Sequence, residues 1–112
     1  MEKIVERSLL FDIYGPLLTD HQKSIYSDVV NNDYSLSEIG EELGISRQGV
    51  HDAVKRIDKI LTDYEDKLHF ADSYEKNQKI IDDIKAELKG LSADGVDCSK
   101  ISSLVDKLSE DL

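Results

Sequence analysis

The residues best suited to chemistry in this 112-residue chain are polar side chains gathered between positions 46 and 56. Arginine pairs with the edge of guanine and glutamine with that of adenine, and a serine at a helix N-terminus suits a phosphate. The candidates are Ser46, Arg47, Gln48, His51, Lys55 and Arg56. We predict a nucleic-acid contact in which Arg47 and Gln48 read bases. Lys55 and Arg56 are then expected to hold phosphates.

The charge of the chain argues both for and against this contact. With 14 basic and 24 acidic residues, the formal net charge is −10. Phosphate binding draws its affinity from clustered lysine and arginine, so the total opposes it. Between Gly44 and Ile60, however, four basic residues stand against two acidic ones. The local balance coincides with the candidate contact, and its acidic surroundings predict weak, salt-sensitive binding.

A helix-turn-helix from Leu36 to Ala53 would position these side chains. Ser35 and Glu38 stand three residues apart, the spacing of a capping box that starts a helix. Gly44 suits a turn with positive φ, after which Ser46 is placed to cap the next helix. The polar candidates would then lie on the outward face at the start of the second helix, the face that such motifs insert into a major groove.

The apolar residues of this motif are expected to bury the contact between its two helices. Gly40 is small at the point where the helices approach each other. The predicted core residues are Ile39, Leu43, Ile45, Val50 and Val54. Alternating helices with a glycine turn also occur in bundles that bind no nucleic acid, so a plain helical bundle is the alternative on spacing alone.

Apolar periodicity predicts an all-α chain of six helices. The expected ranges are residues 4–14, 20–30, 36–43, 47–70, 70–91 and 101–112. Glycine, aspartate and small polar residues in the segment 92–99 indicate a linker. We expect a helix-turn-helix domain with its N-terminal helices at 1–70, and a C-terminal helical extension at 71–112 that packs on it or dimerises with it.

Heptad-spaced apolar residues run along the fourth predicted helix and recur in the two that follow. On the fourth they are Val50, Val54, Ile57, Leu61, Tyr64 and Leu68, and the last stripe ends at Leu112. Such stripes pack helices within one chain or join two copies. A helix from Ser46 to Phe70 would run on the order of 36 Å, longer than a small domain easily covers. A homodimer, with paired reading helices, is therefore expected as well.

No other set of residues has the spacing of a catalytic or metal site. His21, His51 and His69 lie at no ligand spacing, and Cys98 is the single cysteine. We expect no enzymatic activity, no cofactor and no metal. No apolar run approaches the roughly 20 residues of a membrane helix, and the N-terminal residues lack the apolar centre of a signal peptide. A cytoplasmic protein without membrane insertion is predicted.

The run from Ser35 to Val50 resembles the helix-turn-helix of sigma factor region four. Further similar residues flank it: Leu18-Thr19-Asp20-His21-Gln22, Lys55-Arg56, Tyr64-Glu65 and Lys67-Leu68. Together, residues 9–70 resemble the YlxM family of small bacterial proteins. The resemblance implies a sigma-like DNA-binding fold with extra C-terminal helices. It also places Ser46, Arg47 and Gln48 where the related motif makes its contacts.

The same resemblance implies a link to the signal recognition particle pathway, through genes usually encoded beside that particle's GTPase. Two functions follow. One is a DNA-binding regulatory protein, acting as a homodimer. The other is an interaction module that binds the particle's GTPase or RNA without specific DNA binding, with acidic flanks that select a basic partner. The net charge favours the second function, and the Ser-Arg-Gln stretch favours the first.

Overall fold

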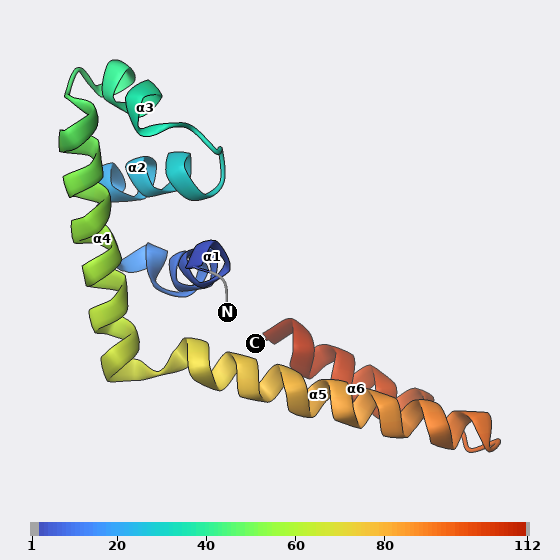
Figure 1. Cartoon of the computed structure of the whole chain (residues 1–112). Coiled ribbons are helices and arrows are strands. Elements are labelled where there is room, and N and C mark those ends of the chain that lie inside the picture. Colours follow the sequence, from blue (N-terminus) through green and yellow to red (C-terminus); the bar gives the residue numbers. More distant parts are fainter. Residues whose placement is uncertain (1–2, 112) are drawn as a thin grey trace. The chain divides into compact units, whose positions relative to one another are not determined.

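The computed structural model describes residues 3–111, which form helices and no strands, as the predicted all-α fold class requires. Its elements are α1 (Lys3–Tyr14), a 3₁₀ turn η1 (Gly15–Leu17), α2 (Asp20–Val30), α3 (Leu36–Leu43), α4 (Arg47–Leu68), α5 (Phe70–Ala93) and α6 (Ser99–Asp111) (Figure 1). Leu112, the end of the last predicted stripe, lies outside the described residues, as does the side chain of Ile4. None of the described helices is long and apolar enough to cross a membrane.

The chain divides into two compact units, residues 1–71 and residues 72–112. The N-terminal unit contains α1 to α4 with the first residues of α5. The C-terminal unit contains the rest of α5 together with α6.

Local sequence sets where the first helices begin and end. α1 stops at Tyr14 because Gly15 and Pro16 follow, and proline cannot extend a helix. Thr19 begins α2 with a capping box: its hydroxyl accepts from Gln22 N at 3.2 Å, and Gln22 Oε1 accepts from Thr19 N at 3.0 Å. The predicted range of the second helix, residues 20–30, is therefore confirmed.

The core of the N-terminal unit is built on α4, against which α1, α2 and α3 pack (Figure 1). Every third or fourth residue of α4 is buried, so one face of the helix is covered along most of its length. Its buried residues are Val50, Val54, Ile57 and Leu61. The predicted stripe is thus buried up to Leu61 and packs against the core as far as the partly buried Tyr64, whereas Leu68 at its end is 43% exposed.

A polar cluster also ties α4 to α1 and α2. The Asp58 carboxylate accepts from Arg7 Nη2 at 2.6 Å and from the Tyr26 hydroxyl at 2.5 Å. Burial, followed by the hydrogen bond to Asp58, raises the pKa of Tyr26, so its hydroxyl stays protonated as a donor. These contacts fix the orientation of α4 relative to the helices behind it.

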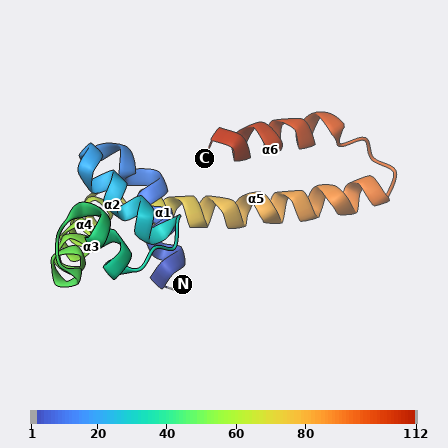
Figure 2. The same cartoon turned by 90° about the horizontal axis from the view of Figure 1, so that it is seen from above.

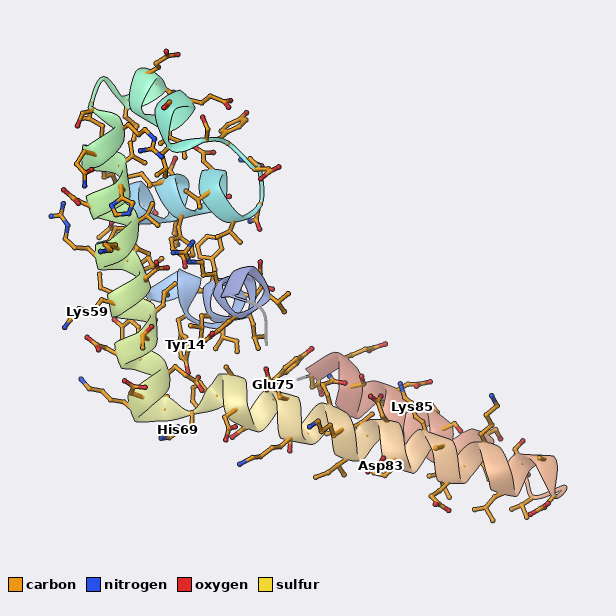
Figure 3. All side chains as sticks on the ribbon, viewed as in Figure 1. Tyr14, Lys59, His69, Glu75, Asp83 and Lys85 are labelled. Carbon is orange, nitrogen blue, oxygen red and sulfur yellow. The ribbon has the colours of Figure 1, made fainter. Side chains whose placement is uncertain are left out.

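A second cluster joins α1 to the end of α4 and the start of α5. Tyr14, almost fully buried, donates its hydroxyl to Glu65 Oε1 at 2.6 Å and accepts from Phe70 N at 3.2 Å. The same Glu65 oxygen accepts from Ala71 N at 2.8 Å and so satisfies a free N–H at the start of α5. His69 makes the break between the helices with a left-handed φ of 56°. Figure 3 labels Tyr14 and His69 at this junction.

The C-terminal unit is a hairpin of two antiparallel helices, α5 and α6, as Figure 2 shows. Four residues form its buried cluster: Ile81, Leu88, Cys98 and Val105. At the start of α6, Asp97 accepts from the Ser99 hydroxyl at 2.7 Å and from Ser99 N at 3.1 Å. These hydrogen bonds hold the pKa of Asp97 below its usual value.

Candidate nucleic-acid interface

The helix-turn-helix is made by α3, the turn at Gly44 and Ile45, and the first turns of α4. Ser35 Oγ accepts from Glu38 N at 3.1 Å, and Glu38 Oε1 accepts from Ser35 N at 3.4 Å. Gly44 ends α3 with a left-handed φ of 72°, which favours glycine. Each of these features is local in sequence, and each lies where the sequence predicts it.

The crossing of α3 over α4 depends on a close backbone approach at Gly40. A Cβ built on Gly40 would lie 2.7 Å from the Ile45 carbonyl oxygen, closer than side-chain carbons approach. Ile39 and Val50 are both fully buried beside this point. The small residue therefore lets the turn fold back tightly enough to set the angle of α4.

Two of the predicted core residues are wrong. Leu43 is 38% exposed and Ile45 is 46% exposed, so they flank the turn rather than completing the core. The reason is that α4 begins only at Arg47, and no earlier turn of that helix lies beside the end of α3. Ile39, Val50 and Val54 carry the contact between the two helices.

The outward face of α4 carries a polar stripe opposite its buried residues. At 100° per residue, positions spaced by four and three line up on one face of a helix. Here they are Gln48, Asp52, Lys55 and Lys59, all exposed, and we call them the outward stripe. Figure 3 shows Lys59 pointing away from α4 on the side remote from α1.

Asp52 lies in the middle of this stripe and contacts its neighbours. Its Oδ1 accepts from Gln48 Nε2 at 3.0 Å, one turn earlier on the helix. Arg56 Nε lies 3.5 Å from the Asp52 carbonyl oxygen. The amide of Gln48 is thus held along the helix surface, and a base would have to compete with Asp52 for it.

His51 lies at the side of α4 rather than on the outward stripe. Its ring is half-buried and borders a cavity lined by Tyr34 and Leu36, at the start of α3. Its Nδ1 is buried, 3.7 Å from Asp52 Oδ1, and makes no hydrogen bond to any described residue. The other predicted contact residues, Ser46, Arg47, Gln48, Lys55 and Arg56, are all exposed.

Ser46 has two roles to fill. Its Oγ accepts from Gly49 N at 3.0 Å and so caps α4. The hydroxyl proton is left to donate outward, at the end of the helix where backbone N–H groups and the helix dipole favour an anion. Capping and a phosphate contact are therefore compatible at this residue.

The electrostatics of the face are more basic than the sequence count indicates. Of the two acidic residues between Gly44 and Ile60, Asp58 faces inward and is neutralised by Arg7. Four basic side chains and the single carboxylate of Asp52 remain toward solvent. The α3 surface beside them is acidic, with exposed Glu38, Glu41 and Glu42. A short basic strip with acidic borders results.

Sequence reasoning missed Asp52 and Lys59 as members of this face. Both positions could have been predicted. Asp52 follows Gln48 by four residues and Lys59 follows Lys55 by four, so both lie on the side of the helix opposite the buried residues. The inward orientation of Asp58 could not have been predicted from local sequence, because its partner Arg7 is 51 positions away in the chain.

Comparison with known proteins adds family evidence to this geometry. Residues 1–97 match a family model described as "Putative helix-turn-helix protein, YlxM / p13 like". A protein of Streptococcus thermophilus is 48% identical over 84 residues, which cover 75% of this chain and 76% of the relative. A protein of Streptococcus equi subsp. zooepidemicus is 46% identical over 87 residues, 78% and 77% of the two chains. A Streptococcus pneumoniae protein is 46% identical over 84 residues, 75% of this chain and 76% of that one. All three relatives carry the family name UPF0122.

Proposed function

Because this chain belongs to the UPF0122 family of YlxM/p13-like helix-turn-helix proteins, we propose that it is a DNA-binding regulatory protein that inserts the start of α4 into a major groove. The observation that carries the proposal is the outward face of α4. Its basic side chains are exposed, and the nearest inward carboxylate, Asp58, is paired with Arg7. The protein acts without catalysis, in the cytoplasm.

In this proposal the contact residues divide by chemistry. Arg47 reads a guanine edge and Gln48 an adenine edge, after Gln48 exchanges its hydrogen bond to Asp52 for one to the base. Lys55 and Arg56 hold phosphates, and Ser46 donates to a phosphate at the N-terminus of α4. His51 contacts the groove from the side of the helix.

A homodimer completes the proposal, because two reading helices related by a two-fold axis would match a paired DNA site. Pairing also offsets the weakness expected of one basic strip with acidic borders, since two linked contacts bind more tightly than either alone.

A titration of a labelled random-sequence duplex pool at low and moderate salt tests this function. Lys55→Ala with Arg56→Ala is expected to reduce the slope of log K against log salt by about two, one per phosphate contact. Lys79→Ala with Lys89→Ala, on α5, removes the same charge elsewhere and is the matched control. Absence of duplex binding at low salt would refute the proposal.

Base reading is tested with a sequence enriched from the same pool. Replacing Arg47 or Gln48 by Ala is expected to weaken binding to that sequence by roughly ten- to a hundredfold while binding to the bulk pool changes less. Equal binding of the two variants and the unchanged chain would show that these side chains do not read bases.

A second function is favoured by the acidic surface of α3. Glu38, Glu41 and Glu42 border the basic strip, and a net charge of −10 suits a basic partner better than a duplex. The alternative is an interaction module of the signal recognition particle, which contacts a basic surface of the particle's GTPase through these acidic residues or contacts its RNA through the basic strip. The same titration with that RNA and that GTPase separates the two functions: saturable binding there, with none to the duplex pool, supports the second.

A further inference from the structure

The α5–α6 hairpin exposes a continuous set of large apolar side chains. On α5 they are Ile80 (56% exposed), Ile84 (36%) and Leu91 (45%), and on α6 they are Ile101 (51%), Leu104 (57%) and Leu108 (50%). We call these six residues the apolar face. Each helix contributes them at spacings of three, four or seven, so on each helix they form a single stripe.

Both stripes lie on the same side of the hairpin. The buried residues, such as Ile81 on α5 and Val105 on α6, mark where each helix faces the other. Relative to these buried residues, the exposed stripes of both helices lie toward one side of the hairpin. Lys85 and Asp106 lie toward the other side, where their charged groups are 3.8 Å apart. Figure 3 shows Lys85 on the side of α5 next to α6 and Asp83 on the opposite side.

The hairpin buries too little apolar surface to be complete alone. Its cluster has four residues, fewer than the six that make up the apolar face. Each half-exposed isoleucine or leucine forgoes a large part of the free energy that full burial of such a side chain provides. Two amphipathic helices reach a well-buried core most simply when a second pair covers their open side, as in a four-helix bundle.

Charges at the two borders of the apolar face indicate what covers it. Along the α5 border lie Asp83 and Glu87, which we call the acidic edge. Along the α6 border lie Lys100 and Lys107, the basic edge, followed by Asp111 at the end of the helix. One surface thus has an apolar centre, an acidic border and a basic border, which is complementary to its own image after a two-fold rotation.

We propose that a second copy of this chain covers the apolar face, with α5 of each copy antiparallel to α6 of the other. The two-fold axis then runs along the helices, so each residue keeps its level. The contact between Lys85 and Asp106 puts Lys107 level with position 84. Lys107 of the second copy therefore lies within about 1.5 Å of the level of Asp83 and about 4.5 Å of that of Glu87, at about 1.5 Å per residue.

The charges also reject the other two-fold arrangement of the hairpins. If α5 packed on α5 of the second copy, each acidic edge would face an acidic edge and each basic edge a basic one. Like charges placed opposite each other destabilise such a contact. This inference deepens the homodimer of the proposed function by naming its surface, and its failure is separate from that of DNA binding because no nucleic acid enters the test.

Sedimentation equilibrium of the full chain, from low to high micromolar concentration, tests the apolar face. The chain is expected to be a dimer, and Leu104→Lys is expected to raise the dimer dissociation constant by about a hundredfold, since the change occurs twice and each costs about tenfold. Leu17→Lys is the matched control, because Leu17 is as exposed (56%) but lies in the N-terminal unit. A monomeric chain throughout, or equal weakening by both variants, would overturn the proposal. Circular dichroism checks that helix content is kept.

A charge swap tests the pairing of α5 with α6. Lys107→Glu alone is expected to weaken the dimer, because each new carboxylate would face an acidic edge. Adding Asp83→Lys and Glu87→Lys to the same chain is expected to restore the dimer, because the α5 edge is then basic and faces the new carboxylate on α6 of the second copy. In a dimer that pairs α5 with α5, Asp83→Lys and Glu87→Lys would give no rescue, and that result would overturn the arrangement. Neither set of variants changes the outward stripe of α4.

Discussion

The two units of this chain bury apolar side chains to very different extents. Among the described residues, the N-terminal unit has eleven residues in its buried cluster and seven large apolar side chains exposed. The C-terminal unit has four in its cluster and seven exposed. The first unit is a nearly closed core that holds α4 at a set angle. The second resembles half of a core, as expected of a segment that completes its burial by association.

Polar contacts between helices are also shorter and less exposed in the N-terminal unit than in the C-terminal unit. In the N-terminal unit, the carboxylates of Asp58 and Glu65 join elements 51 positions apart in the chain, through Arg7 and Tyr14. In the C-terminal unit the pair that bridges the helices, Lys85 and Asp106, is exposed and longer, at 3.8 Å. Rigid support is therefore placed behind the candidate DNA-reading helix, where a small change of angle would displace Arg47 and Gln48 from a base.

Truncation of a core side chain should give the largest difference in stability between the two units. Leu61→Ala in α4 is expected to lower the free energy of unfolding by about 2–5 kcal/mol, because Leu61 is fully buried and the surrounding helices cannot collapse into the cavity. This loss should not depend on protein concentration. Urea unfolding followed by hydrogen exchange, which reports each unit separately, measures it.

The matched change in the C-terminal unit is Leu88→Ala. Its cost is expected to lie at the low end of that range, about 2 kcal/mol, and to grow with protein concentration as the hairpins associate. Concentration dependence in the Leu61 variant, or its absence in the Leu88 variant, would break the comparison between a closed and an open core.

Removal of one carboxylate charge from each unit should give a smaller contrast. Asp58→Asn is expected to destabilise the N-terminal unit by about 1.5–3 kcal/mol, because partly buried Arg7 loses its charged partner and Tyr26 loses a carboxylate acceptor. Asp106→Asn is the control, with an expected loss of less than about 1 kcal/mol since its pair with Lys85 is solvent-exposed. Thermal unfolding of both variants measures the difference, and equal losses would contradict it.

These contacts mark the limit of what the sequence could predict. Caps and turns depend on residues within three or four positions, so Thr19 with Gln22, Ser35 with Glu38, and Gly44 were all predictable. Periodicity likewise predicted the buried face of α4. Which side chains beside a turn are covered depends on where the next helix begins, and for that reason Leu43 and Ile45 were predicted wrongly.

The same reasoning applies to the candidate site. The exposed side chains at the start of α4 could be predicted from the local sequence pattern. The position of Asp52 on the same face could have been predicted in the same way. Asp58, by contrast, looked like an acidic residue in the basic stretch. Only its tertiary contact with Arg7 removes it from the charge that a ligand would meet. Long-range pairing, which no spacing rule encodes, thus changes the electrostatics of the interface.

High pH should lower the stability of the N-terminal unit more than that of the C-terminal unit. We expect this difference to be smaller than those produced by core truncation and by removal of a carboxylate charge. Burial, followed by a hydrogen bond to Glu65, raises the pKa of Tyr14 above its usual 10.0, and burial with a hydrogen bond to Asp58 raises that of Tyr26. A raised pKa in the folded state means that both tyrosines contribute stability in full below about pH 10. That contribution is lost as pH rises from there through the folded-state pKa, because the unfolded chain releases its protons first.

The N-terminal unit should therefore unfold more readily above pH 10, as measured by tyrosinate absorbance together with hydrogen exchange. Tyr14→Phe combined with Tyr26→Phe is expected to lower stability at neutral pH but to flatten its decline above pH 10, since the titrating hydroxyls are gone. Tyr34→Phe, at an exposed position, is the control and should leave the decline unchanged. An equally steep decline in the double variant would show that the two buried hydroxyls do not cause the alkaline sensitivity of this unit.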